Sequence, residues 1–239
     1  MSSTEVWDQL YAYIDPPRTP LHEHLSAEKE ETLIALIASS PGAAKERNAR
    51  GDYPLHVALS FASTTKALVD ALLDAFPGAA KEKSSKGNCP LHIALTAIIL
   101  ARDGRWTGIP SYRPWDHDAI VEQRDAQIVS LIDTVITAWP GALKEKDANG
   151  DYPLHLTSLK YRDLNPLVGL PEAVVAAVYS AWPGGIHATD SAGKTPLYYG
   201  DLPCVPDDVV RDCMGTLSPE ACCSLYLRDG KRVVEDEFL

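Results

Sequence analysis

The feature that most constrains the fold is a short motif that recurs along the chain. The letters GDYPLH occupy residues 51–56 and again 150–155, and a related stretch, GNCPLH, occupies 87–92. The Pro-Leu-His core begins at Pro20, Pro54, Pro90 and Pro153, and a Pro-Leu-Tyr version begins at Pro196. Successive copies lie 34, 36, 63 and 43 residues apart. A recurrence on this scale predicts a repeat protein in which each unit is one supersecondary element.

A second motif, Pro-Gly, keeps a constant distance from the first. It begins at Pro41, Pro77, Pro140 and Pro183, and the next Pro-Leu follows each time after 13 residues. One part of the unit is therefore fixed in length, and all of the length variation falls elsewhere.

Each fixed segment contains the residues of a tight turn. A glycine precedes each Pro-Leu by three residues, and Asn48, Ser84, Asp147 and Asp190 precede those glycines by three more. Asn, Asp and Ser side chains stabilise such turns, and glycine adopts a positive φ without strain. The segment is predicted to be an extended hairpin, followed by a helix that opens with proline at its first position. The Thr195 hydroxyl is predicted to cap the last of these helices.

An amphipathic helix is predicted before each Pro-Gly. Apolar residues recur at i, i+1, i+4, i+5 and i+8, which places them on one helical face. They are Leu68, Val69, Leu72, Leu73 and Phe76; Leu131, Ile132, Val135, Ile136 and Trp139; and Val174, Val175, Val178, Tyr179 and Trp182.

These units resemble the ankyrin repeat. The resemblance rests on YPLHVAL at 53–59 and CPLHIAL at 89–95, on the preceding glycine, and on the period near 34. It implies an all-α solenoid of helix-turn-helix units joined by hairpin loops. We therefore expect an N-terminal helical cap over 1–19, a repeat array over 20–200 and a C-terminal helical cap and tail over 201–239. The family's tips and first helices commonly bind protein partners.

The bulk composition narrows the function. The 239 residues carry a formal net charge of −11, which disfavours binding to nucleic acid or to an anionic membrane. The first residues lack the basic and apolar regions of a secretory signal, and the longest apolar run, 93–101, is too short to span a bilayer. Five cysteines without an even spacing indicate reduced thiols. We therefore expect a cytoplasmic or nuclear protein.

The recurring histidine has a structural and a chemical interpretation. As implied by the resemblance, His22, His56, His92 and His155 are framework residues that bond near the start of their helices and tie neighbouring repeats. As metal ligands or general bases, several of them would have to converge. Stacked repeats hold equivalent residues apart, because each unit contacts only its neighbours. We therefore expect no metal, no cofactor and no enzymatic activity.

The long third spacing points to an insertion over 102–125 between the two helices of one unit. Asp116 is a candidate N-cap that would extend the second helix toward its N-terminus. Over 102–115 three arginines stand against one aspartate, and this part carries residue types that are enriched in binding hot spots. Two roles are open for its aromatic side chains, which either anchor the loop on the array or bind a partner. The candidates are Trp106, Tyr112, Arg113 and Trp115.

The pattern fails after Pro196, where Gly200, Pro203 and Pro206 interrupt the expected first helix. Two short helices are predicted at 207–215 and 218–228. The cysteines here lack the close C-x2-C spacing of a zinc site, and we expect them to be small buried residues.

The sequence thus predicts a monomeric, non-enzymatic scaffold or adaptor that binds a protein partner, with no nucleic acid and no membrane. The alternative is an enzyme or metal-binding protein with its site in the insertion or the C-terminal cap. Tyr53 and Tyr152 are candidate anchors, although packing between hairpin and helix is the other interpretation. The candidate partner-binding residues at the tips are Arg50, Asp52, Tyr53, Lys86, Asn88, Asn149, Asp151 and Tyr152.

Overall fold

The computed structural model describes residues 3–14, 22–61, 64–102, 118–158, 170–199, 202 and 204–214. Within these ranges the chain is all-helical, as predicted, and contains no β-strand. The described part of the chain contains ten α-helices and four short 3-10 helices.

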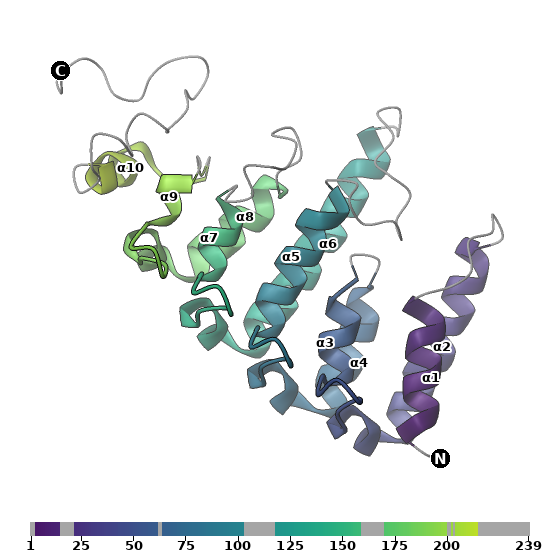
Figure 1. Cartoon of the computed structure of the whole chain (residues 1–239). Coiled ribbons are helices and arrows are strands. Elements are labelled where there is room, and N and C mark those ends of the chain that lie inside the picture. The colour runs from purple at the N-terminus through teal and green to yellow at the C-terminus, as the bar shows by residue number, and fades with distance from the viewer. Residues whose placement is uncertain are drawn as a thin grey trace.

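The helices form two rows (Figure 1). The first row consists of α1 (Ser3–Ile14), α3 (Pro54–Leu59), α5 (Pro90–Arg102), α7 (Pro153–Thr157) and α9 (Pro196–Tyr199). The second consists of α2 (His22–Ser39), α4 (Lys66–Ala75), α6 (Asp118–Ala138) and α8 (Glu172–Ala181), and α10 (Asp207–Met214) follows the rows. Each helix packs on its successor in the same row, and α1 on α2, α3 on α4, α5 on α6 and α7 on α8 pack between the rows.

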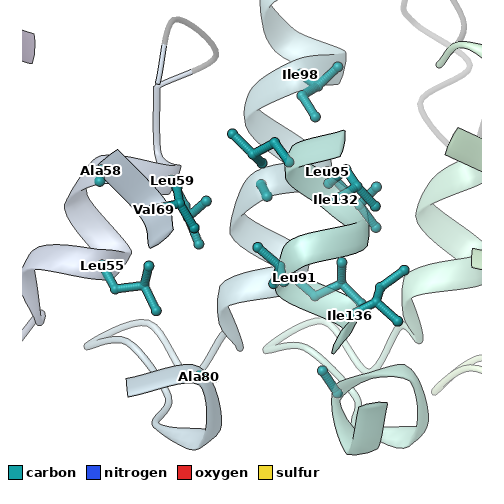
Figure 2. Close-up of a cluster of buried hydrophobic side chains, with 14 of the residues drawn as sticks. Leu55, Ala58, Leu59, Val69, Ala80, Leu91, Leu95, Ile98, Ile132 and Ile136 are labelled. Carbon is teal, nitrogen blue, oxygen red and sulfur yellow. The ribbon is translucent and has the colours of Figure 1, made fainter. Parts of the chain in front are cut away.

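The core is one continuous layer between the two rows. The apolar face predicted for the second helices is confirmed, because Leu68, Val69 and Leu72 of α4 are all buried, as are their counterparts in α6 and α8. Figure 2 shows part of this layer around α3 to α6, where Leu59 and Val69 point toward the next helix pair. At about 25 cal/mol per Å² of apolar surface, this burial is the main favourable term in folding.

The Pro-Gly motifs do not begin extended arms, which corrects the prediction. Each motif opens a 3-10 helix: η1 (Pro41–Lys45), η2 (Pro77–Lys81), η3 (Pro140–Lys144) and η4 (Pro183–His187). Proline fits this first position because its φ is fixed and its missing N–H is not needed there. In η3 the Trp139 ring lies over Gly141, and a Cβ on that glycine would stand 2.5 Å from the ring nitrogen. Close aromatic packing thus explains the glycine.

The predicted turns do follow each 3-10 helix. We name residues 46–53, 82–89, 145–152 and 188–195 the tip segments. Gly51, Gly87, Gly150 and Gly193 have φ values of 89°, 82°, 86° and 73°, a region that side chains other than glycine rarely adopt. The four 3-10 helices and tip segments lie along one edge of the two rows (Figure 1).

His22 does not occupy the position of the other three recurring histidines, which corrects the prediction from the sequence. His22 begins α2, which lies in the second row, and the first-row helix of this pair is α1. Proline is favoured near the start of any helix, so the three letters alone do not identify the row. The expected boundary between 1–19 and 20–200 falls between α1 and α2, which pack against each other.

The two ends of the predicted insertion are visible as longer helices. α5 has 13 residues where α3 has 6, and α6 has 21 residues where α4 and α8 each have 10. The expected extension of the second helix is confirmed. Asp116, its predicted cap, lies outside the described residues.

The C-terminal part agrees with the interrupted pattern. α9 is only four residues long, and α10 over Asp207–Met214 matches the first of the two predicted helices. The second, at 218–228, lies outside the described residues. Thr195 does not cap α9 as predicted, because its buried hydroxyl makes no hydrogen bond with any described residue.

The glycine of the Pro-Gly motif offers a matched pair of variants. We expect Gly141→Ala to lower the free energy of unfolding by about 1–3 kcal/mol, because the new methyl displaces the packed Trp139 ring. Gly42→Ala is the control, since nothing lies within 4 Å of its Cβ position. Urea unfolding of both variants measures the difference. Equal stabilities would contradict the packing role of the glycine.

Candidate protein-binding surface

The tip segments are held in shape by their own side chains. Asn48 Oδ1 accepts hydrogen bonds from the backbone N–H groups of Arg50 and Asp52, each at 2.9 Å. Asp147 Oδ1 accepts equivalent bonds from Asn149 and Asp151 at 2.8 and 2.9 Å. Asp190 does the same in the last segment, and Ser84 Oγ accepts one such bond in the second. The predicted turn formers therefore act as expected.

Neighbouring tips are also bonded to each other. The Ser85 N–H donates to Asp52 Oδ1 at 2.7 Å, and the Ala148 N–H donates to Asn88 Oδ1 at 3.0 Å. At the third junction Ser191 Oγ donates to the Asn149 carbonyl at 2.7 Å. The four tips thus form one connected edge, which we call the tip edge.

Buried histidines tie the first-row helices to this edge. Nε2 of His56 donates to the Glu82 carbonyl at 2.9 Å, Nε2 of His92 to Asp151 at 3.1 Å and Nε2 of His155 to Lys194 at 3.0 Å. Each acceptor belongs to the following tip segment. The structural interpretation of these three residues predicted such contacts between neighbouring units.

His56 also closes the start of its own helix. Its Nδ1 accepts the Tyr53 N–H at 3.2 Å, so the ring is the neutral tautomer with its proton on Nε2. Burial disfavours the charged ring and lowers the pKa of both His56 and His92 below the ordinary value. Nearby carboxylates and the carbonyl bond oppose this effect and are smaller.

The predicted partner-binding residues divide by exposure. Arg50, Lys86 and Asn149 are exposed at the turns. Asp52 and Asn88 are half-buried, and their side chains bond to the next tip.

Asp151 is 2% exposed, which is too little for its side chain to contact a partner directly. Its carbonyl instead accepts the bond from His92. The sequence cannot reveal this burial, because Asp151 stands at the position of the half-buried Asp52.

Tyr53 and Tyr152 are half-buried between successive segments. The Tyr53 ring lies 5.4 Å from that of Phe76, and the Tyr152 ring lies 5.4 Å from that of Trp182. A cation covers each ring, with the Arg47 guanidinium 4.2 Å from the Tyr53 centroid and Lys146 Nζ 5.1 Å from that of Tyr152. These contacts favour the packing interpretation over the role of partner anchor.

The second tip segment carries Cys89 where the first and third have tyrosine. Its side chain is 0% exposed, and burial raises the pKa of the thiol to about 11. Cys89 is therefore a neutral packing residue at neutral pH.

Ion pairs that were not predicted from the sequence run along the tip edge. Arg47 pairs with Glu82 at 2.9 Å, and Lys83 pairs with Glu145 at 3.0 Å. In each pair the base follows its Pro-Gly proline by six residues and the acid follows the next such proline by five. Exposed pairs of this kind contribute at most about 1 kcal/mol each. In the sequence, the residues that form these pairs lie in the repeated triplets KER, KEK and KEK.

The insertion candidates Trp106, Tyr112, Arg113 and Trp115 lie outside the described residues, as do Cys222 and Cys223. In the C-terminal part that is described, Cys213 is buried and its Sγ lies 3.5 Å from Nδ1 of His187. No group of three or more His, Cys, Asp or Glu residues suited to a metal ion occurs within the described ranges.

A shallow groove of about 510 Å³ lies on the second row, between α4 and α6. Three aspartates line it, namely Asp70, Asp74 and Asp133, and Lys66 pairs with the first of them. Every helix in the described part of the chain is too short or too polar to cross a membrane.

Comparisons with known proteins gave no match: neither a protein-family model nor a curated protein corresponds to this sequence.

The lowered pKa values predict how stability depends on pH. The unfolded chain binds protons at histidine near pH 6.5, whereas folded His56 and His92 bind them only at lower pH. The contribution of these two histidines to the free energy of unfolding is therefore complete above about pH 6.5. It falls as the pH drops toward the folded pKa values, by at most about 1.4 kcal/mol per pH unit for each histidine. Urea unfolding across this range measures the slope.

The variant His92→Gln removes one of the two titrating groups and should flatten the slope. Asn149→Gln, at an exposed side chain that does not titrate, is the control and should leave the slope unchanged. An unaltered slope in the double variant His56→Gln, His92→Gln would show that other groups carry the pH dependence.

Proposed function

We propose that this chain is an ankyrin-like repeat solenoid that serves as a non-enzymatic scaffold or adaptor for a protein partner. The proposal is supported by the two rows of helices in chain order and by the fixed spacing from Pro-Gly to Pro-Leu. It is also supported by the histidine ties between each first-row helix and the next tip segment.

The observation that carries the proposal is the connected tip edge. Side chains already bond the turn backbone within each tip and between tips, so little order remains to be imposed when a partner binds. A surface that is organised in advance loses less conformational entropy on association. Rigid turns with outward side chains are therefore well suited to recognition.

Partner contacts on this surface come from the exposed tip residues Arg50, Lys86 and Asn149. Half-exposed Val57 and Ile93 on the first-row helices extend the surface away from the tips. The insertion residues Trp106, Tyr112, Arg113 and Trp115 remain candidates for a second contact region. We place this activity in the cytoplasm or nucleus and assign it to a monomer.

Site-specific photo-crosslinking in the cells that produce the protein tests this proposal. A benzophenone amino acid is introduced singly at Arg50, Lys86 or Asn149. We expect the three positions to capture the same protein, because they lie on one connected edge. Mass spectrometry identifies the captured protein.

Matched controls carry the same probe at Asp74, Asp133 or Glu172, which are exposed on second-row helices. These variants should not capture that protein. Equal capture from both sets of positions, or capture from the second row alone, would contradict binding through the tips. Replacing 103–114 by a short Gly/Ser turn then shows whether the insertion contributes, since loss of capture with an unchanged circular dichroism spectrum assigns it a binding role.

A further inference from the structure

Charge is distributed unevenly over the tip edge and the 3-10 helices beneath it. The whole chain has a net charge of −11, yet η1, η2 and η3 each end in a lysine. These residues are Lys45, Lys81 and Lys144, and all three are exposed. They occupy one position of the recurring segment, the fourth after the Pro-Gly proline. We call them the lysine row.

The lysine row is not used in holding the fold together. The basic side chains that pair between segments are Arg47 and Lys83, which lie two residues further on in their segments. No member of the row joins an ion pair in the described part of the chain. The same is true of Arg50 and Lys86, the exposed bases at the two neighbouring turns. The row and these two bases thus present five cationic groups to solvent.

The row has a definite length. In η4 the equivalent position is His187, whose Nδ1 lies 3.5 Å from the buried Cys213 sulfur. The free cations therefore span three consecutive segments and stop before the C-terminal part of the molecule.

The spacing of the row follows from the packing of the helices. Packed helices are separated by about 8–10 Å, so equivalent residues of successive segments advance by about that distance. A peptide in the polyproline II conformation rises about 3.1 Å per residue and has three residues per turn, so three of its residues cover one step and every third side chain lies on the same face. A carboxylate at every third position of such a peptide would face each lysine in turn.

We propose that the lysine row binds an extended segment of a partner protein with Asp or Glu at every third residue. This inference rests on the proposed scaffold function and specifies the chemistry of its partner. Arg50 and Lys86 lie in the tip segments that directly follow Lys45 and Lys81, and they supply further positive potential. Ionic contacts of this kind would fix the register of the bound segment and raise its association rate more than they would raise its affinity.

The charges around the row favour a peptide over nucleic acid. A glutamate directly follows each lysine, at Glu46, Glu82 and Glu145. A nucleic-acid strand carries a phosphate about every 3.4 Å of rise, and this continuous charge would run past those glutamates as well as the lysines. A peptide with separated carboxylates avoids that repulsion.

The test uses a fluorescein-labelled synthetic peptide of roughly 12 residues, with Glu at every third position and Gly or Ser between, in fluorescence anisotropy at low salt. A comparison peptide has the same composition with its Glu residues grouped at one end. We expect the spaced peptide to bind the full chain more tightly than the grouped one. The triple variant Lys45→Gln, Lys81→Gln, Lys144→Gln should weaken this binding roughly tenfold, since it removes three exposed ionic contacts.

The control is the triple variant Lys29→Gln, Lys66→Gln, Arg211→Gln, which changes the net charge equally on α2, α4 and α10. It should keep the affinity of the original chain, and circular dichroism checks that both variants are folded. Equal binding of the two peptides, or equal loss in both variants, would overturn the inference. Tighter binding of a single-stranded oligonucleotide that displaces the peptide would overturn the choice of a peptide partner.

Failure here is distinct from failure of the proposed function. If tip crosslinks capture a protein while the spaced peptide does not bind, the scaffold function stands and the acidic segment is rejected. If neither occurs, both proposals fail.

Discussion

The structure depends on side chains of one segment that satisfy backbone groups of the next. Histidine Nε2 donates to a carbonyl of the following tip segment, and Asp52 and Asn88 accept backbone N–H groups there. Exposed turns of this kind bury little apolar surface, so hydrophobic packing alone would not fix their position. These bonds fix the tip edge to the packed helices. The loss of any one of them would leave a buried or constrained polar group without its hydrogen-bond partner. The proposed binding surface is thus an outcome of the same contacts that align the helices.

Much of the local structure could be predicted from the sequence, because it depends on short-range chemistry. The turn glycines, the Asn and Asp residues that close the turns and the apolar faces of the second helices all follow from residue type and spacing. The 3-10 helices were missed because Pro-Gly is compatible with either an extended or a helical start. His22 was misplaced because proline favours the start of a helix in either row.

The candidate surface was harder to predict, because exposure depends on contacts between segments. Asp52 and Asp151 follow the same turn glycine in identical motifs, yet one is half-buried and the other is 2% exposed. Tyr53 and Tyr152 looked equally suited to anchoring a partner, but Phe76 and Trp182 from the following segments pack against them. The lysine row was present in the repeated PGAAKE and PGALKE letters, and its significance emerged only once the ion pairs of its neighbours were known.

Amide hydrogen exchange at Ser85 and Ala148 tests the central claim most directly. Both residues are exposed at turns, and each N–H is held by a side chain of the preceding segment. We expect slow exchange at both amides in the native chain. In the variant Asp52→Ala, we expect Ser85 to lose this protection while Ala148 keeps it. Exchange of both amides at the rate of an unstructured peptide in the native chain would contradict the claim that side-chain bonds between segments organise the tip edge.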